Sequence, residues 1–234
     1  MRRKRSMEVK AERSLRTRMV ALKTALLSDA LGKTGAMDHD MKCFSANCRM
    51  AGPAATLRVH TADILMVGKA LSMCAQGKVL VIDGQGERNT ALWGSIITMA
   101  ARLKALQGVV IDGAIRDVAG IRRDRLPVFA RSVVPNAGGA EYLGELNVPI
   151  QCGGVVVNPG DWVVGDEDGV VVIPANRLPS VLKKAELLGQ IEKQIVRAVR
   201  RGQDLASLLR YDEALERKSR EPVLPQMRIT QRGS

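Results

Sequence analysis

The chain has 234 residues and a formal net charge of +12; 46% of its residues are hydrophobic and only 3% are aromatic. This length is enough to bury a sizeable core, so we expect one globular domain with extensions and an aliphatic core. The few aromatic rings leave little for single-stranded nucleic acid to stack on. No apolar run is long enough to cross a membrane, and the basic start lacks a signal-peptide hydrophobic region, so the cytoplasm is the expected compartment.

Residues 1–27 are expected to form a basic arm and the start of the first helix. The arm opens with Arg2-Arg3-Lys4-Arg5. Solvated terminal charge is a commoner explanation of such a run than contact with RNA or a nuclear-import receptor. Apolar residues then recur at helical spacing over residues 19–30, and Gly32 ends this predicted helix.

The two histidines and four cysteines do not predict a zinc site. Cys43 and Cys48 lack a matching second pair, so we expect all four cysteines to be reduced thiols that mostly fill the core. His39 stands between two aspartates and offers a metal ligand or a proton carrier. Because it has no partner at ligand spacing, an exposed loop histidine is the preferred interpretation.

The next segment predicts two strands, a helix and two turns. The Gly52-Pro53 pair predicts a turn before a strand at 55–59. A helix is expected over 63–76 and an apolar strand over 78–82. The turn that follows, 83–86, has the start of a dinucleotide fingerprint but lacks its third glycine and its acidic partner. We therefore expect this turn only to bring backbone close to a ligand.

Residues 89–117 are the stretch around which the chain is organised. Asn89 or Thr90 is expected to cap a helix, because apolar residues recur at helical spacing after them. Gly108 ends the predicted helix. The β-branched run at 109–111 then predicts a buried strand.

An arginine and an aspartate follow this strand directly. The Asp112-Gly113 pair predicts a turn that places Arg116 and Asp117 side by side at the strand's end, where open α/β proteins usually bind ligands. The arginine offers a planar fork to a carboxylate, and the aspartate offers oxygen to a cation such as magnesium. Together they suit an α-keto acid. The alternative, a solvated pair that contributes little, is the commoner role of adjacent charges at a strand end.

The remaining residues predict strands and then a long helix. A flexible loop at 135–139 is able to approach the site or to serve as a plain connector. Strands are expected at 148–150, 154–157, 162–164 and 170–173, the last three as a β-meander with tight turns at 158–161 and 166–169. An amphipathic helix is expected over 178–201. Residues 203–234 form a C-terminal tail, whose last part is loose or an arm across a neighbouring subunit.

Two motifs resemble the signature of one family. The first runs from residue 108 to Asp117, with Trp93-Gly94 upstream, and the second is the stretch 157–174. Both resemble the family that joins 4-hydroxy-4-methyl-2-oxoglutarate aldolases to the regulator of ribonuclease activity A. The resemblance implies an α/β fold of the swivelling β/β/α type, with a mixed, largely β core flanked by helices, over residues 28–202. It also implies a homotrimer, or a hexamer of two trimers, with sites at subunit boundaries.

The resemblance further implies a divalent-metal-dependent lyase that releases pyruvate from an α-keto acid such as 4-hydroxy-4-methyl-2-oxoglutarate or oxaloacetate. Arg116 would bind the keto or carboxylate oxygen of the substrate. Asp117 would hold Mg²⁺ or Mn²⁺, which stabilises the enolate formed when the carbon-carbon bond breaks. In the family's aldolases, backbone amides hold the pyruvyl carboxylate, and this role carries over to Gly94, Ser95, Ile96 and Ile97.

The alternative is a non-catalytic trimeric binding protein that resembles the regulator, an inhibitor of ribonuclease E. The basic charge would then favour an acidic protein or RNA as partner. One position departs from the aldolase pattern: metal-using members commonly have an acidic residue where this chain has Ser95. We therefore expect weak magnesium binding, with Glu192 of a neighbouring subunit as the candidate replacement in the water shell around the metal.

Overall fold

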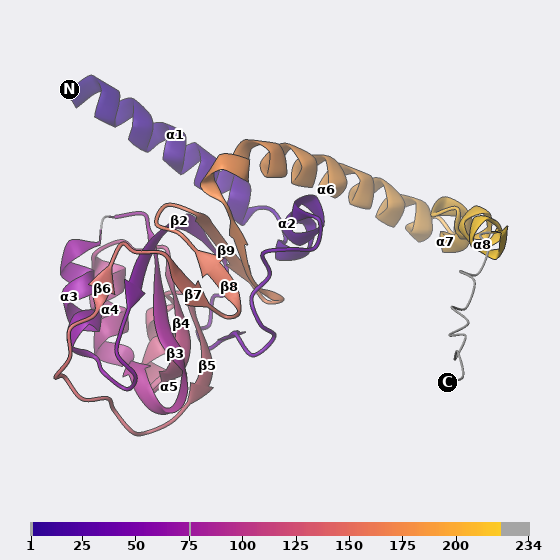
Figure 1. The fold of residues 1–234 in the computed structure, drawn as a ribbon. Helices are drawn as coiled ribbons and strands as arrows, with labels where there is room; N and C mark the ends of the chain where they lie inside the picture. The colour runs from indigo at the N-terminus through magenta and orange to yellow at the C-terminus, as the bar shows by residue number, and fades with distance from the viewer. Residues whose placement is uncertain (1, 75, 221–234) are drawn as a thin grey trace, which may run out of the picture. The chain divides into compact units, whose positions relative to one another are not determined.

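Figure 1 shows the computed structural model, which describes residues 2–74 and 76–220. The chain divides into two units, residues 1–188 and 189–234. All strands among the described residues belong to the first unit. None of the helices in the described part of the chain has the length and apolarity that a membrane crossing requires.

A mixed sheet of eight strands organises the first unit. Strands β2, β3, β4 and β5 are parallel neighbours, and the others join the sheet in antiparallel pairs. The order is β1-β5-β4-β3-β2-β9-β10, with β6 also on β2, while β7 and β8 form a separate hairpin. The bounds are β1 (Lys42–Cys43), β2 (Met50–Arg58), β3 (Val79–Trp93), β4 (Gly108–Ile115), β5 (Val128–Val133), β6 (Glu145–Leu146), β7 (Ile150–Cys152), β8 (Val155–Val157), β9 (Trp162–Asp166) and β10 (Gly169–Ile173). The predicted α/β fold with a mixed, largely β core is confirmed.

Helices and the β7–β8 hairpin cover opposite faces of the parallel strands (Figure 1). Helices α3 (Leu65–Met73), α4 (Ser95–Leu103) and α5 (Val118–Asp124) pack on one face. The hairpin packs on the other, around Phe129. Every residue of β4 is buried, which explains why its sequence is a nearly continuous apolar run.

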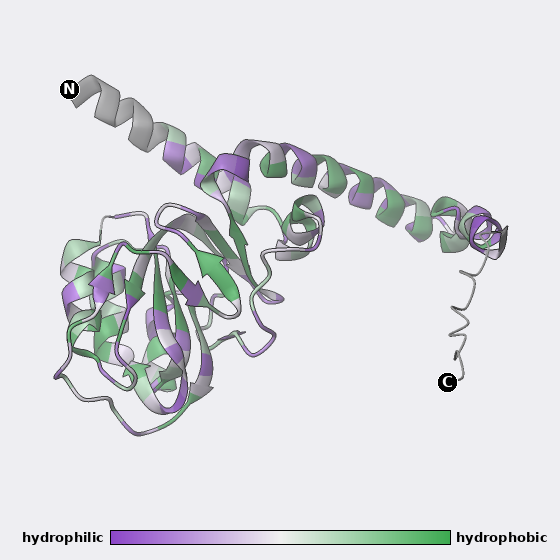
Figure 2. Cartoon of the chain, viewed as in Figure 1, coloured by the Kyte–Doolittle hydropathy of each residue, from purple (hydrophilic) through white to green (hydrophobic). Residues whose placement is uncertain are grey.

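A third apolar cluster lies where helices pack on β9 and β10. Helix α1 (Arg2–Val20) and α2 (Thr24–Leu31) replace the single helix predicted over 19–30. The break has a cause: the backbone N–H and the hydroxyl of Thr24 both donate to the carboxylate of Asp166, at 2.8 and 2.6 Å. As predicted, an amphipathic helix follows the last strand, α6 (Leu178–Arg200), in which hydrophobic and hydrophilic residues alternate (Figure 2).

Beyond α6, the second unit contains two short helices, α7 (Leu205–Leu208) and α8 (Tyr211–Arg220). The predicted loose tail falls mostly in residues 221–234, which lie outside the described residues.

The predicted turn at 83–86 and the helix cap at Asn89 or Thr90 are both wrong. Strand β3 continues to Trp93 and pairs with the second half of β4 after shifts in register. Gln85 and Gly86 have φ of 59° and 72°, so the glycine turn is a kink within the strand instead of its end. Asn89 and Thr90 lie in the second half of β3, and α4 begins only after Gly94.

The predicted Asp112-Gly113 turn is also wrong, because β4 runs through both residues. Asp112 is 5% exposed. Its carboxylate accepts hydrogen bonds from the guanidinium of Arg131 and from the backbone N–H of Gly153, the latter at 2.6 Å. A buried carboxylate with both a cation and a backbone donor is satisfied, so the strand continues past it.

The predicted Gly52-Pro53 turn lies inside β2 instead. Residues 50–53 pair with β9, and residues 54–58 pair with β3. Pro53 therefore stands where β2 changes neighbours. The predicted three-stranded meander is wrong as well, because β8 pairs with β7 while β9 pairs with β2 and β10.

Two of the four cysteines are not reduced thiols. Cys43 and Cys48 form a disulfide that closes the loop after β1. Their spacing gave no sign of this, because the pairing depends on how the loop folds back beside β5. Cys152 is a buried free thiol, as predicted, and Cys74 is partly buried and free.

Candidate active site

Arg116 and Asp117 lie side by side directly after β4, as predicted. The backbone N–H of Arg116 donates to the carbonyl of Trp93 at 2.9 Å, which holds the ends of β3 and β4 together. Asp117 adopts a left-handed conformation, with φ 59° and ψ 39°, and precedes the first turn of α5. Both side chains reach solvent, with 44% and 48% of their surfaces exposed.

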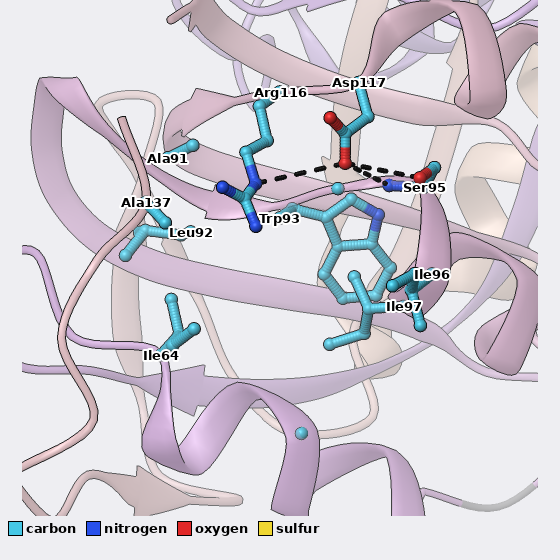
Figure 3. Close-up of a pocket in the computed structure, with 12 residues that line it drawn as sticks. Ile64, Ala91, Leu92, Trp93, Ser95, Ile96, Ile97, Arg116, Asp117 and Ala137 are labelled. Atoms are coloured by element: carbon cyan, nitrogen blue, oxygen red, sulfur yellow. Dashed lines mark hydrogen bonds and ion pairs between the residues drawn. The ribbon is translucent and has the colours of Figure 1, made fainter. Parts of the chain in front are cut away.

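The carboxylate of Asp117 faces the start of α4 (Figure 3). The backbone N–H and the hydroxyl of Ser95 donate to Oδ2 of Asp117 at 3.4 and 3.2 Å. The Nε of Arg116 lies 3.9 Å from the same oxygen. Segments 22 residues apart therefore meet at one carboxylate oxygen.

Gly94 has no side chain, which leaves space for the carboxylate of Asp117 beside Ser95 and Arg116. A Cβ at position 94 would lie 2.9 Å from Oδ2 of Asp117 and 3.4 Å from Cγ of Arg116. The backbone of Gly94 is extended, so the space, and not the conformation, requires a glycine. Gly120 on α5 is also required by space. A Cβ at position 120 would lie only 2.4 Å from the Cβ of Ser95, so α4 and α5 approach each other closely here.

Buried hydrogen bonds fix the turn between β3 and α4. The indole Nε1 of Trp93 donates to the hydroxyl of Thr98 at 2.7 Å, and this hydroxyl donates to the carbonyl of Gly94 at 2.8 Å. The first backbone hydrogen bond of α4 also runs from Thr98 to Gly94. The amides of Ser95, Ile96 and Ile97 therefore precede the helix's own hydrogen bonds, and their N–H groups carry the positive end of its dipole.

A cavity of about 240 Å³ opens beside these groups (Figure 3). Arg116 and Asp117 are charged, Ser95 is polar, and the other lining residues are apolar or glycine: Ile64, Gly68, Ala91, Leu92, Trp93, Gly94, Ile96, Ile97 and Ala137. The loop at 135–139 reaches this cavity, because the N–H of Ala91 donates to the carbonyl of Asn136 at 2.8 Å. Of the two interpretations of this loop, approach to the site is the one that the geometry favours.

A family model described as RraA-like, Aldolase/RraA, matches residues 24–172. The chain belongs to the RraA-like family. The match includes the first motif, all but the last two residues of the second, and the cavity beside Arg116 and Asp117. The family assignment and the fold that it implies are therefore confirmed.

The relatives of this RraA-like chain have names of more than one kind. It is similar to an uncharacterised protein of Methanocaldococcus jannaschii, 40% identical over 163 residues that cover 69% of this chain and 78% of the relative. It is similar to a 4-hydroxy-4-methyl-2-oxoglutarate aldolase of Thermus thermophilus, 36% identical over 152 residues that cover 65% and 92%. A solved structure titled as the RNA-processing inhibitor RraA from a Thermus species matches with a TM-score of 0.61 and 36% identity, covering 65% and 92%.

The donor groups of the cavity fit a magnesium ion that keeps most of its water. Asp117 is the one carboxylate among the lining residues. Magnesium in proteins usually keeps several waters and binds one or two carboxylates, and the exposed carboxylate of Asp117 matches the lower end of that range. Ser95 adds a neutral hydroxyl and no charge. Glu192 belongs to the second unit, and its role in the water shell around a metal remains a prediction.

A second cavity, of about 460 Å³ and lined mostly by polar residues, was not predicted. Arg131 lines it and pairs with Asp112 and with Asp38, the latter at 3.1 Å. A hydrogen bond from the backbone of Asp40, together with Arg131, lowers the pKa of Asp38. These charges pair with one another, which favours a role in holding the loop at Asp38 against β4 and β5.

Three neighbouring side chains at this cavity's edge bring metal-type ligand atoms within 4.8 Å of one another: Asp38, His39 and Asp40. Arg131 and Arg88 already pair with the two carboxylates. His39 is 87% exposed, which confirms it as an exposed loop histidine.

Proposed function

We propose that this RraA-like chain is a lyase that acts on an α-keto acid and releases pyruvate. The observation that carries the proposal is the convergence of Arg116, Asp117 and the first amides of α4 on one cavity. The names of its aldolase relatives support the same reaction class.

Each group has a role that its position supports. The N–H groups of Ile96 and Ile97 at the start of α4 bind the pyruvyl carboxylate, because a helix N-terminus is a ready anion site and the N–H of Ser95 already donates to Asp117. The guanidinium of Arg116 donates to the keto oxygen and so stabilises the charge that develops there as the carbon-carbon bond breaks. Ser95 orients the carboxylate of Asp117 through its hydroxyl.

Asp117 is the residue that would hold a divalent cation, Mg²⁺ or Mn²⁺. When bound, such an ion supplies positive charge that stabilises the enolate oxygen. Retro-aldol cleavage and decarboxylation of oxaloacetate give the same enolate of pyruvate, so one site is able to perform both reactions.

Pyruvate release from oxaloacetate and from 4-hydroxy-4-methyl-2-oxoglutarate, with and without Mg²⁺, tests the proposal. We expect release that depends on the metal and that is lost in Arg116→Ala. The proposal is wrong if the purified protein releases no more pyruvate from either substrate than the Arg116→Ala variant does.

A second candidate is a binding protein, which the match to a structure titled as an RNA-processing inhibitor supports. The net charge of +12 then favours an acidic protein surface or RNA as partner. Saturable binding to a purified ribonuclease E, by a protein that lacks lyase activity at every metal concentration, would favour this candidate.

A further inference from the structure

The loop after β1 covers the outer edge of β5, and the disulfide between Cys43 and Cys48 closes this loop. Strand β1 itself is only two residues long. Beyond it, the N–H of Phe44 donates to the carbonyl of Val128 at 2.9 Å, and the N–H of Val128 donates to the hydroxyl of Ser45 at 3.3 Å. Without the loop, both backbone groups of Val128 would lie on an open sheet edge.

The loop packs on both faces of the sheet. Phe44 is partly buried against the apolar cluster on the helix face, and the two cysteines are partly buried against the cluster around Phe129 on the opposite face. The two cysteines are 5 positions apart in the sequence. Because a disulfide stabilises a fold less when it closes a shorter loop, this one acts on the loop more than on the whole chain.

The disulfide is open to attack by a thiol. Cys43 and Cys48 are partly exposed, and the exposed cations Lys42 and Arg49 stand directly outside them in the sequence. Positive charge attracts an anionic thiolate, and exposed disulfides are in general the ones that thiols reduce and re-form.

We propose that the disulfide between Cys43 and Cys48 is a redox-sensitive latch that holds this loop on the edge of β5. The thiolate of a reductant such as glutathione attacks one sulfur, so the S–S bond breaks and a mixed disulfide forms. A second glutathione thiolate displaces the protein sulfur. The protein gains two electrons and two protons, and the two glutathione molecules leave as their own disulfide, so atoms and charge balance.

Reduction opens the loop locally and leaves the rest of the sheet in place. Hydrogen bonds to Val128 and the packing of Phe44 then hold the loop without a cross-link, so it leaves the edge of β5 more often. Val128 begins β5, whereas Arg116 follows the end of the parallel neighbour β4. The latch therefore lies at the other end of these strands from the proposed active site and does not rest on the proposed function.

Hydrogen exchange of the whole protein, in oxidised and in reduced glutathione, tests the latch. We expect the amides of Phe44 and Val128 to exchange at least about tenfold faster in the reduced form, because local opening costs less without the cross-link. The amide of Val110, inside β4, should exchange at the same rate in both forms. Equal rates at Phe44 and Val128 in the two forms overturn the proposal. An equal acceleration at Val110 also overturns it, because the disulfide would then stabilise the whole fold.

Alkylation and mass spectrometry show whether the latch is reversible. We expect Cys43 and Cys48 to become thiols in excess reduced glutathione and to pair again in excess oxidised glutathione. A disulfide that persists in the native protein under excess reduced glutathione is a permanent cross-link and overturns the proposal.

Two serine variants assign the response to this disulfide. Cys48→Ser should exchange fast at Phe44 under both conditions, because it is unable to form the cross-link. Cys74→Ser is the matched control, since it removes a partly buried free thiol and should keep the response of the wild type. A redox response that survives in Cys48→Ser, or that is lost in Cys74→Ser, contradicts the assignment.

Discussion

The hydroxyl of Ser95 lies 3.2 Å from the Oδ2 of Asp117, although the two residues come from the starts of different helices. In the same place, Arg116 brings its Nε to 3.9 Å from this oxygen. One carboxylate oxygen thus connects the two helix starts and the end of β4. The proposed chemistry depends on this oxygen more than on any other atom described.

Removal of either charged side chain is expected to abolish lyase turnover. Arg116→Ala and Asp117→Ala should each lower kcat by about 10²–10³-fold, because Arg116 stabilises the developing oxyanion and Asp117 would hold the cation that does the same. Stability should change by no more than about 1 kcal/mol, because both side chains are nearly half exposed and such pairs contribute little. Pyruvate release and urea unfolding measure the two quantities.

The exposed Arg122 on α5 provides the control for this pair. Arg122→Ala should keep full activity. Unfolding of both Arg116→Ala and Asp117→Ala would mean that the pair is structural, and full activity in either variant would refute its role.

Gly94→Ala is expected to damage the site and spare the fold. The added Cβ would lie 2.9 Å from Oδ2 of Asp117, so the short aspartate side chain has to move away from Ser95. Activity should fall at least about tenfold, because a misplacement of this size at a reacting group is costly. Gly139→Ala is the control, since a Cβ there meets no atom within 4 Å. Equal activity of the two variants would contradict this account.

The sequence predicted the strand at 109–111 and the charged pair after it because both signals are local. A β-branched run has few alternatives to a buried strand, and residues that follow such a strand must lie at its end. The error at Asn89 and Thr90 has the opposite origin. These residues favour helix caps locally, but pairing between β3 and β4 keeps them in a strand, and no local signal reveals that pairing.

Long-range partners explain the other errors. Asp112 looked like a turn residue because its partner, Arg131, is 19 residues further along the chain. The disulfide between Cys43 and Cys48 likewise depends on the path of the loop beside β5. For the cavity, Gly94 was predicted from resemblance, whereas Ile64 and Gly68 were missed because α3 reaches the site only through the packing of helices on the sheet.

The stability of the chain should depend on Asp63 in acid. Burial by itself raises the pKa of Asp63, but backbone hydrogen bonds from Glu141, Leu65 and Tyr142 outweigh it and leave the pKa below its ordinary value. A carboxyl with a lowered folded pKa stabilises the fold above its ordinary pKa of about 4, and this contribution is lost as the pH falls through the folded pKa.

Asp63→Asn tests this dependence. The variant should be less stable at pH 7 and should lose less additional stability between about pH 5 and pH 2 than the wild type. Urea unfolding across this range measures both effects, with Asp29→Asn, exposed on α2, as the control. An unchanged pH dependence in Asp63→Asn would show that the contacts of this carboxyl do not couple to folding.

We propose a homotrimer or a hexamer of two trimers in solution. Helix α4 presents Ile96, Met99 and Leu103 on one face, with 79%, 47% and 74% of their surfaces exposed. Such a face beside a cavity is typical of an interface. Light scattering at micromolar concentration should give a trimer or larger species, and Met99→Glu should shift it toward smaller ones. A wild-type monomer under these conditions would contradict the proposal.

Ser95→Asp is expected to strengthen the binding of a divalent cation. The hydroxyl of Ser95 already lies beside Asp117, so a carboxylate at this position adds negative charge where only one lining residue supplies it. Residues that order the surroundings of a metal typically change its affinity about 10- to 100-fold. Titration of Mg²⁺ by calorimetry and against pyruvate release should therefore give a lower dissociation constant for Ser95→Asp.

Ser95→Asn is the matched control, since the asparagine side chain has the same shape as that of aspartate but no charge. If the two variants bind Mg²⁺ equally, or if Ser95→Asp binds it more weakly than the wild type does, position 95 does not face the metal. If neither the wild type nor Ser95→Asp responds to any divalent cation, the binding-protein candidate becomes the better account of this chain.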